Sequence, residues 1–307
     1  MITETEKSSP APPPDAQQIR DILSQVIDPE VGRDIVSLGP VYRVEVAAGP
    51  QEKWTSERVL SMRWWTPTLV SFRTTRYRGF RFTPGHYTRL GLGAGAAGSG
   101  DCLWRPFSLA SAAYDDFLEF IAVLVPGGAF SEPLRQLRVG DAIRVDKASY
   151  GFLTVDQLAP GKDLWLLASG TGLGPFLSIL RDPSVWQNHE RLIVVHSVRL
   201  SSELAWRDEI VAMPQGELFA EAKATLTYLP VVTREPGASK LAERIPLLLA
   251  DGRLEAAAAC ALELATSRVL VCGNPEMSRE LRQFLTSRGF ATNRRGVPGQ
   301  MAFEKYW

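Results

Sequence analysis

The stretch that decides the fold is DLWLLASGTGLGPFLSIL, residues 163–180. Its first half is a nearly continuous apolar run, typical of a strand buried on both faces of a parallel sheet. A glycine-rich turn at 169–175 follows directly and opens a helical segment. Glycines at such a turn let the backbone approach a pyrophosphate, although a glycine turn without a ligand is the alternative.

Strands and helices continue to alternate from residue 161 to the end of the chain. Further apolar runs have the length of strands, and segments with helical spacing separate them. This alternation indicates a doubly wound parallel sheet of the α/β class over 161–307. The expected strands are 191–198, 225–233 and 268–273, and the expected helices are 174–182, 203–213, 240–259 and 276–289.

The preceding segment, 51–160, has a different pattern. Short strands follow one another, separated by turns that contain proline or glycine, and one short helix interrupts them at 131–140. Strands at this spacing suggest a small antiparallel β-barrel. The sequence therefore predicts two domains, a β-barrel followed by the α/β domain. The expected barrel strands are 58–65, 69–77, 86–92, 105–111, 117–125 and 141–148.

Residues 1–50 form a tail and a small extension. The first 14 residues are polar and proline-rich and are expected to remain flexible. Apolar residues at helical spacing predict a short helix over 15–28, and alternation predicts a strand within 35–46.

Composition excludes several classes of function. The chain has 34 basic and 34 acidic residues without a basic tract, which disfavours nucleic acid as a partner. No run of about 18 apolar residues and no apolar signal core is present, so we expect a cytoplasmic protein without a membrane span. Cys102, Cys260 and Cys272 are too few and too widely spaced for a zinc or iron–sulfur site, so no metal is expected.

Arginines close the strands that follow the glycine turn. Arg199 and Arg234 each end a strand, and Arg244 lies in the next helical segment. Ligands of doubly wound sheets bind outside the carboxyl ends of the strands, where arginines suit a phosphate. This placement favours NADPH over NADH, although surface ion pairing would explain any one of these arginines.

Two further motifs are, each by itself, only weak evidence for a cofactor site. RPFSLAS, 105–111, offers an arginine for a phosphate, an aromatic ring for a flat cofactor and a hydroxyl for a ring heteroatom, but an ordinary strand would look the same. VCGNPEM, 271–277, ends the last predicted strand, where Cys272 would face the same crevice as the glycine turn. A buried free cysteine is more often a small apolar residue.

In this order and spacing, the motifs resemble the ferredoxin–NADP⁺ reductase family, and the bacterial ferredoxin/flavodoxin type in particular. The resemblance covers roughly residues 53–307. The motifs that carry it are FTPGHYTRLGL (82–92), RPFS (105–108), SGTGLGPFLSIL (169–180), HSVR (196–199), VVTRE (231–235), ERIP (243–246), CGNPEM (272–277) and MAFEKYW (301–307).

The resemblance implies roles for individual residues. Ser108, Cys272 and Glu304 would flank the reacting rings as catalytic residues. The FAD contacts would be Arg105, Pro106, Phe107, Ser108, Ile121, Ala122, Val123, Ala129, Phe130, Ser131, Thr171, Tyr306 and Trp307. The NADP(H) contacts would be Gly170, Thr171, Gly172, Pro175, Ser197, Arg199, Thr233, Arg234, Arg244, Cys272, Gly273, Asn274 and Pro275.

The chain departs from the family pattern in two places. Phe107 stands where the family usually has tyrosine, so a hydroxyl bond to the flavin side chain would be lost while stacking survives. The N-terminal segment resembles the opening of a small family linked to iron–sulfur cluster assembly, but Ser37 and Pro40 differ from its preferences and its later cysteine region is absent.

The resemblance implies a ferredoxin/flavodoxin–NADP⁺ reductase. A hydride would pass from NADPH to FAD, and single electrons would then pass to ferredoxin or flavodoxin. No C-x₄-C-x₂-C motif is present, so electrons would leave to a separate acceptor. The alternatives are the NAD(P)H-dependent reductase component of an oxygenase, a free-flavin reductase, or an iron–sulfur assembly accessory that acts through its N-terminal arm.

Overall fold

The computed structural model describes residues 52–93, 102–293 and 296–305. The chain divides into two compact units, Met1–Glu52 and Lys53–Trp307, and every described helix and strand belongs to the second. The helix predicted over 15–28 and the strand predicted within 35–46 lie outside the described residues.

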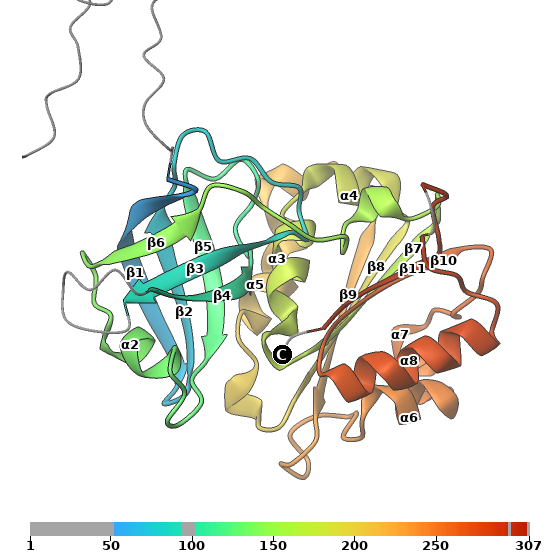
Figure 1. Ribbon diagram of the computed structural model, residues 1–307. Coiled ribbons are helices and arrows are strands. Elements are labelled where there is room, and N and C mark those ends of the chain that lie inside the picture. Colours follow the sequence, from blue (N-terminus) through green and yellow to red (C-terminus); the bar gives the residue numbers. More distant parts are fainter. Residues whose placement is uncertain (1–51, 94–101, 294–295, 306–307) are drawn as a thin grey trace, which may run out of the picture. The chain divides into compact units, whose positions relative to one another are not determined.

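The first part of the second unit is an antiparallel sheet that curls into a barrel (Figure 1). Its strand order is β4-β3-β6-β1-β2-β5. The strands are β1 (Trp54–Thr66), β2 (Leu69–Thr75), β3 (Tyr87–Gly93), β4 (Cys102–Ser108), β5 (Phe117–Val123) and β6 (Ala142–Asp146), with the short helix α2 (Ser131–Gln136) between β5 and β6.

Large apolar side chains fill the inside of this barrel. Phe72 and Phe120 are fully buried on neighbouring strands, with ring centroids 5.5 Å apart. Phe107 of β4 lies edge to face with Phe120 of β5 at 6.4 Å, so the two terminal strands of the sheet meet across the core. The predicted antiparallel barrel is confirmed.

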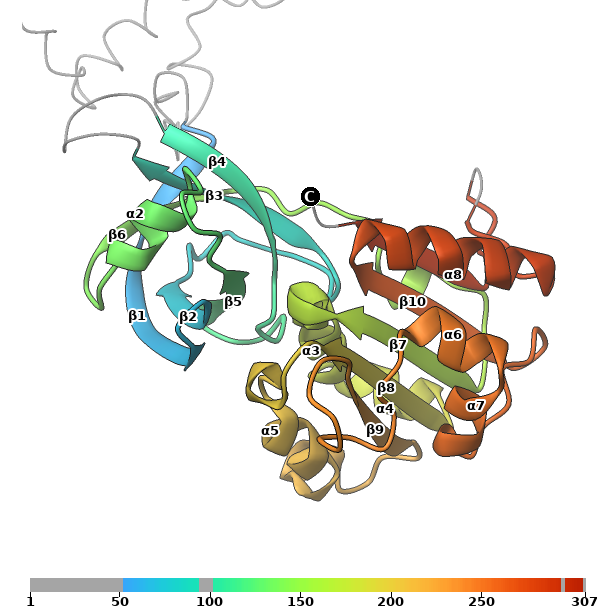
Figure 2. The ribbon, with the colours of Figure 1, turned by 90° about the horizontal axis from the view of Figure 1, so that it is seen from below.

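The second part is a parallel five-stranded sheet in the order β11-β10-β7-β8-β9, seen from below in Figure 2. Its strands are β7 (Asp163–Ser169), β8 (Arg191–Val198), β9 (Thr225–Val232), β10 (Ser267–Gly273) and β11 (Met301–Lys305). Its α-helices are α3 (Gly174–Leu180), α4 (Pro183–Asn188), α5 (Arg207–Ala212), α6 (Ile245–Ala250), α7 (Arg253–Ala258) and α8 (Pro275–Ser287). Short 3₁₀ turns η1 (Val155–Gln157), η2 (Gly170–Leu173), η3 (Ser201–Glu203), η4 (Met213–Gln215) and η5 (Glu217–Phe219) complete the connections.

Alternate residues of strand β7 point to opposite faces of this sheet. Leu164 and Leu166 belong to one buried cluster with helix α3, whereas Trp165 and Leu167 belong to another with helices α6 and α8. Both faces are therefore covered, which explains why the strand reads as a continuous apolar run. The predicted doubly wound sheet is confirmed.

Three elements of this part of the chain differ from the sequence-based prediction, and one of them is helix α4, which was not expected. The single helix expected over 240–259 is two helices, α6 and α7, because Gly252 between them adopts a left-handed φ of 78°. The fifth strand, β11, was not expected, and it pairs with β10 in parallel. The predicted boundary at 160/161 lies between β6 and β7 and stays a prediction.

A buried carboxylate joins the barrel to the parallel sheet. Glu119 of β5 is only 4% exposed and accepts from Arg73 of β2 at 2.7 Å and from Arg181, just after α3, at 2.6 Å. Arg181 also donates to the carbonyl of Ala110 at 2.7 Å. Because an arginine from one half satisfies a buried carboxylate of the other, this cluster fixes the relative orientation of the two halves.

An aromatic contact holds the same two halves at a second point. The rings of Trp65 on β1 and Trp206 before α5 are 5.2 Å apart. Arg63 lies over the Trp65 ring at 3.6 Å and pairs with Glu209 of α5 at 2.5 Å. Trp206 adopts a left-handed φ of 55°, which is costly for a bulky residue and must be offset by this packing.

We expect Glu119→Gln to destabilise the protein by about 3 kcal/mol, because it leaves Arg181 without its buried partner. Urea unfolding of the purified protein measures the change. Glu190→Gln is the matched control, since Glu190 pairs with Lys162 with both side chains about 60% exposed and should cost less than about 1 kcal/mol. Equal losses in the two variants would contradict the structural role of Glu119.

Candidate functional site

A large cavity opens at the carboxyl ends of the parallel strands. Its volume is about 760 Å³. The glycine turn after β7, the ends of β8 and β9 and the start of α8 form one wall, and Thr68, Leu69 and the end of β5 form the other. The cavity therefore lies at the ligand-binding edge of a doubly wound sheet, as predicted.

A second cavity, of about 280 Å³, opens on the barrel side. Phe107, Ile121 and Ala122 give it flat, apolar walls, and Arg105 stands at its rim, exposed to solvent. The hydroxyl of Ser108 lines it and, within the described residues, is buried without a hydrogen-bond partner. Apolar walls with an unsatisfied hydroxyl fit a flat ring that carries heteroatoms, such as a flavin.

Thr171 lines both cavities, together with Val123 and Val125. A Cβ placed on Gly174, at the start of α3, would lie 3.3 Å from Ile121 and 3.6 Å from Ser108. The backbone that follows the glycine turn thus packs directly against the barrel strands. Two flat ligands in the two cavities would meet at Thr171.

The glycine turn is locked against the loop that follows β10. A Cβ on Gly172 would lie 2.3 Å from the carbonyl oxygen of Cys272, and a Cβ on Gly273 would lie 2.3 Å from the hydroxyl of Ser169. The amide of Asn274 donates to that hydroxyl at 2.8 Å. Only glycine allows this approach, so the GTG and CGN motifs form one unit.

A buried histidine of the neighbouring strand β8 forms a hydrogen bond to the same glycine turn. His196 of β8 is 1% exposed, with Nε2 3.2 Å from the carbonyl of Gly170 and Nδ1 3.2 Å from the hydroxyl of Tyr228 on β9. Burial lowers the pKa of His196 to about 4. The ring is therefore neutral at pH 7, so Nε2–H donates to Gly170 and Nδ1 accepts from Tyr228.

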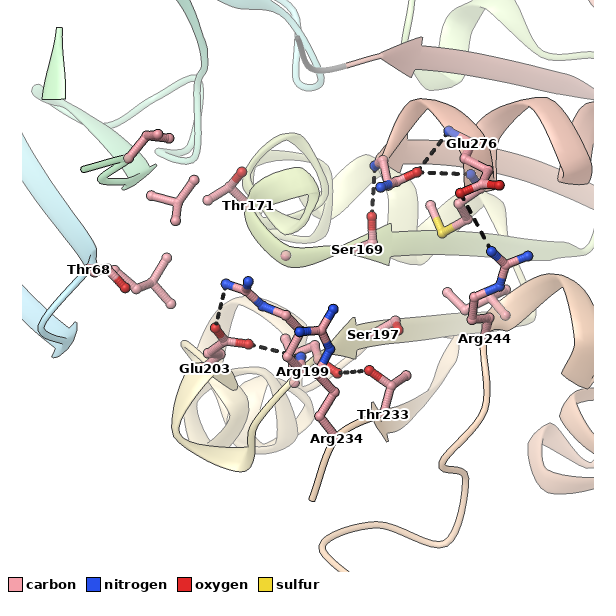
Figure 3. A pocket seen from close by; sticks show the side chains of 18 of the residues that line it. Thr68, Ser169, Thr171, Ser197, Arg199, Glu203, Thr233, Arg234, Arg244 and Glu276 are labelled. Carbon is pink, nitrogen blue, oxygen red and sulfur yellow. Dashed lines mark hydrogen bonds and ion pairs between the residues drawn. The ribbon is translucent and has the colours of Figure 1, made fainter. Parts of the chain in front are cut away.

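Three arginines (Arg199, Arg234 and Arg244) and two acidic side chains (Glu203 and Glu276) line the larger cavity (Figure 3). Arg199 pairs with Glu203 at 3.1 Å, and Glu203 also accepts from the backbone amide of Arg199 at 2.9 Å. Arg244 contacts Glu276 of α8 at 3.6 Å. The structure places Arg244 at the N-cap of α6, immediately before the helix and not inside it as expected.

Cys272 and Glu304 are neighbours on the parallel strands β10 and β11. Burial raises the pKa of the Cys272 thiol well above its ordinary value, and the nearby Glu304 raises it further. Burial also raises the pKa of Glu304 to about 7. Its Oε2 is buried and, within the described residues, has no hydrogen-bond partner. The pair is therefore a neutral thiol beside a carboxyl that titrates near physiological pH.

The structure brings most of the predicted residues to the two cavities. Of the described residues predicted to contact FAD, only Ala129 is absent from the wall of the second cavity, and it is exposed. Tyr306 and Trp307 lie outside the described residues. The predicted NADP(H) contacts in the wall of the larger cavity are Gly170, Thr171, Ser197, Arg199, Thr233, Arg234, Arg244 and Asn274; Gly172, Pro175, Cys272, Gly273 and Pro275 are not part of that wall. The role of each residue stays a prediction.

Among the residues in or behind the cavity walls that the sequence did not predict are Glu203, His196 and Tyr228. Glu203 could have been found, since it follows Arg199 by four residues at ion-pair spacing. His196 and Tyr228 gave no signal, because buried residues of two different strands meet only in the folded sheet.

An antiparallel barrel that precedes a doubly wound sheet, with cavities meeting at a shared threonine, defines an oxidoreductase of the flavin- and nicotinamide-linked class. The family model of the oxidoreductase NAD-binding domain matches residues 166–283. The chain is 39% identical over 255 residues to ferredoxin–NADP reductase A of Sorangium cellulosum, with 82% of this chain and 90% of that protein covered. It is also 39% identical over 254 residues to the ferredoxin–NADP reductase of Pseudomonas aeruginosa, with 81% and 96% covered. The chain belongs to the ferredoxin–NADP reductase family.

A solved structure agrees with this assignment. The ferredoxin–NADP⁺ reductase of Neisseria gonorrhoeae, crystallised with bound FAD and NADP, superposes with a TM-score of 0.76 at 36% identity, covering 83% of this chain and 99% of that one. A second family model, that of an iron–sulfur cluster assembly protein, matches residues 16–50, as the N-terminal resemblance predicted. Within the described part of the chain, no helix has the length and apolar character needed to cross a membrane.

We expect Gly172→Ala to weaken NADP⁺ binding and to destabilise the fold by about 1–3 kcal/mol, because the new methyl group would collide with the backbone of Cys272. Calorimetric NADP⁺ titration and thermal unfolding measure the two effects. The control is Gly216→Ala, where a Cβ would lie 3.3 Å from the carbonyl of Met213, away from both cavities. Unchanged NADP⁺ affinity in Gly172→Ala would show that the contact between Gly172 and the backbone of Cys272 does not shape the nucleotide site.

Proposed function

We propose that the protein is an NADPH-oxidising flavoenzyme that passes electrons one at a time to ferredoxin or flavodoxin. The observation that carries the proposal is the meeting of the two cavities at Thr171, one walled by the barrel and the other by the arginine-bearing ends of parallel strands. FAD would bind to the barrel half, 51–160, and NADP(H) to the sheet half, 161–307. All three cysteines are free, which suits the reducing cytoplasm.

Bound FAD would supply the redox chemistry, by accepting a hydride from NADPH and releasing electrons singly. The chain's own residues would orient the two rings and exclude water from between them. Arg105 would hold the flavin's pyrophosphate, and the Phe107 ring would lie against the flavin. Phe107 also packs against Phe130 at 5.4 Å, so a stacking surface is available without the hydroxyl of a tyrosine.

Ser108, Cys272 and Glu304 would complete the site around the reacting rings. The unpartnered Ser108 hydroxyl would donate to a flavin ring atom, and the neutral Cys272, buried behind the cavity wall, would add no charge near the nicotinamide. Glu304 would hold a proton at its carboxyl below about pH 7. Hydride transfer itself needs no general acid, so Glu304 would act when a proton enters or leaves the reduced site.

The test of the function is a visible absorption spectrum followed by anaerobic titration with NADPH and, separately, with NADH. We expect a flavin spectrum that NADPH bleaches rapidly and NADH poorly, and cytochrome reduction that requires added ferredoxin or flavodoxin. Equal bleaching by both nucleotides would favour an oxygenase reductase or a flavin reductase. A protein without flavin, even after FAD is added, would refute the proposal and favour an accessory acting through residues 16–50, which match an iron–sulfur assembly family.

The pKa of Glu304 predicts a pH dependence. Because the folded-state pKa of about 7 lies above the ordinary value of about 4.3, the protonated carboxyl stabilises the fold. This contribution is complete below about pH 4 and is lost as the pH rises through about 7. We expect Glu304→Gln to be more stable than the wild type at pH 8 by up to about 3 kcal/mol.

The same substitution should flatten the pH profile of carrier reduction near pH 7. Urea unfolding and steady-state rates between pH 5 and 9 check both effects, with Glu190→Gln as the control for a change of charge at a remote, exposed site. An inflection near pH 7 that survives in Glu304→Gln would show that another group titrates.

A further inference from the structure

Two glutamates of helix α8 contact the guanidinium of Arg244 in different ways. Nη2 of Arg244 lies 2.7 Å and 2.6 Å from the two carboxylate oxygens of Glu280. Nη1 lies 3.6 Å from Glu276. The glutamates are four residues apart on one helix, so both reach the same arginine from successive turns.

Glu280 binds Arg244 from outside the nucleotide cavity. It is not part of the cavity wall, and its side chain is 27% exposed. Both of its oxygens accept from a single nitrogen of Arg244, which leaves Nη1 unused by this pair. A guanidinium anchored through one nitrogen loses side-chain freedom before any ligand arrives, so its remaining donors are preorganised.

Glu276 lies inside the cavity and contacts Arg244 loosely. It is part of the wall together with Arg244 (Figure 3). Its side chain is 56% exposed. The distance of 3.6 Å to Nη1 is too long for a hydrogen bond. Glu276 therefore places a negative charge at the surface that a phosphate would have to approach, beside the donor that the phosphate would use.

We propose that Glu280 positions Arg244 for the 2′-phosphate of NADP(H), whereas Glu276 competes with that phosphate for the same guanidinium. The inference rests on the proposed function, since it takes Arg244 as a contact of the phosphate. A phosphate monoester carries about −1.5 to −2 charges at pH 7. It therefore displaces a loosely held carboxylate from Nη1, while the Glu280 contact to Nη2 remains in place.

The two carboxylates thus have opposite effects on affinity. Removing the charge of Glu276 removes both the competition for Nη1 and the repulsion of the phosphate. Removing the charge of Glu280 frees Arg244 to leave the site. Neither change touches a nucleotide that lacks the 2′-phosphate. The balance of Glu276 and Glu280 would set how strongly the site prefers NADP(H) to NAD(H), and how readily it releases NADP⁺.

The test compares Glu276→Gln and Glu280→Gln in the FAD-loaded protein. Calorimetric titration at 0.15 M salt gives the dissociation constants for NADP⁺ and NAD⁺. We expect Glu276→Gln to lower the constant for NADP⁺ by about two- to fivefold and Glu280→Gln to raise it by about as much. The constant for NAD⁺ should stay the same in both variants.

The matched control is Glu243→Gln, which removes the same charge next to Arg244 in the chain. Glu243 pairs instead with Arg253 at 2.7 Å, with a side chain that is 51% exposed, so both dissociation constants should be unchanged. Melting temperatures verify that each variant is folded.

Shifts of the same sign in the two variants, no shift in either, or an equal shift for NAD⁺ would overturn the assignment of the glutamates while leaving the proposed function intact. A wild-type protein that binds NADP⁺ and NAD⁺ equally would overturn the NADPH preference itself, and the roles of the glutamates with it.

Discussion

The contact between two backbone loops is the constraint on which the site depends. Gly172 packs against the carbonyl of Cys272, and Gly273 packs against Ser169, at distances that leave no room for a side chain. The contact exists because strands β7 and β10 are hydrogen-bonded neighbours in parallel register, so their carboxyl ends meet at one edge. It gives the nucleotide cavity a rigid floor, which the neutral His196 supports through the carbonyl of Gly170.

The orientation of the barrel relative to this edge depends on a buried charge. Glu119 could not be buried alone, and arginines from both halves satisfy it. The apolar cluster around Phe176 also includes Ile121 and Ala110 of the barrel part, so packing and charge pairing act on the same interface. Together they bring Thr171 to the junction of the two cavities, where a hydride would have to cross only a short distance.

Two of the arginines that line the larger cavity are paired with glutamates of the same chain. Arg199 and Arg244 each have carboxylate partners before a nucleotide binds. Such pairing avoids leaving uncompensated cations close together, and it weakens the attraction for a phosphate that approaches these arginines directly. A site of this kind selects its ligand by geometry, because only a phosphate that reaches the free N–H donors of an arginine displaces the carboxylate paired with it.

Local sequence patterns determined the order of the elements, the two-part architecture and the loops that carry the site. The apolar run at 163–169 has to be a buried parallel strand. In the glycine turn that follows, Gly170 adopts a left-handed φ of 54° and Gly172 allows a close backbone approach. The tertiary structure alone decided the partners of each side chain. Three features join residues far apart in the chain: the pairing of strand β11, the contact of His196 with Tyr228, and the pairing of Arg244 with Glu276 and Glu280. The split of helices α6 and α7 depends on a single backbone angle. Periodicity reports which face of an element is buried, and it carries no information about which other element covers that face.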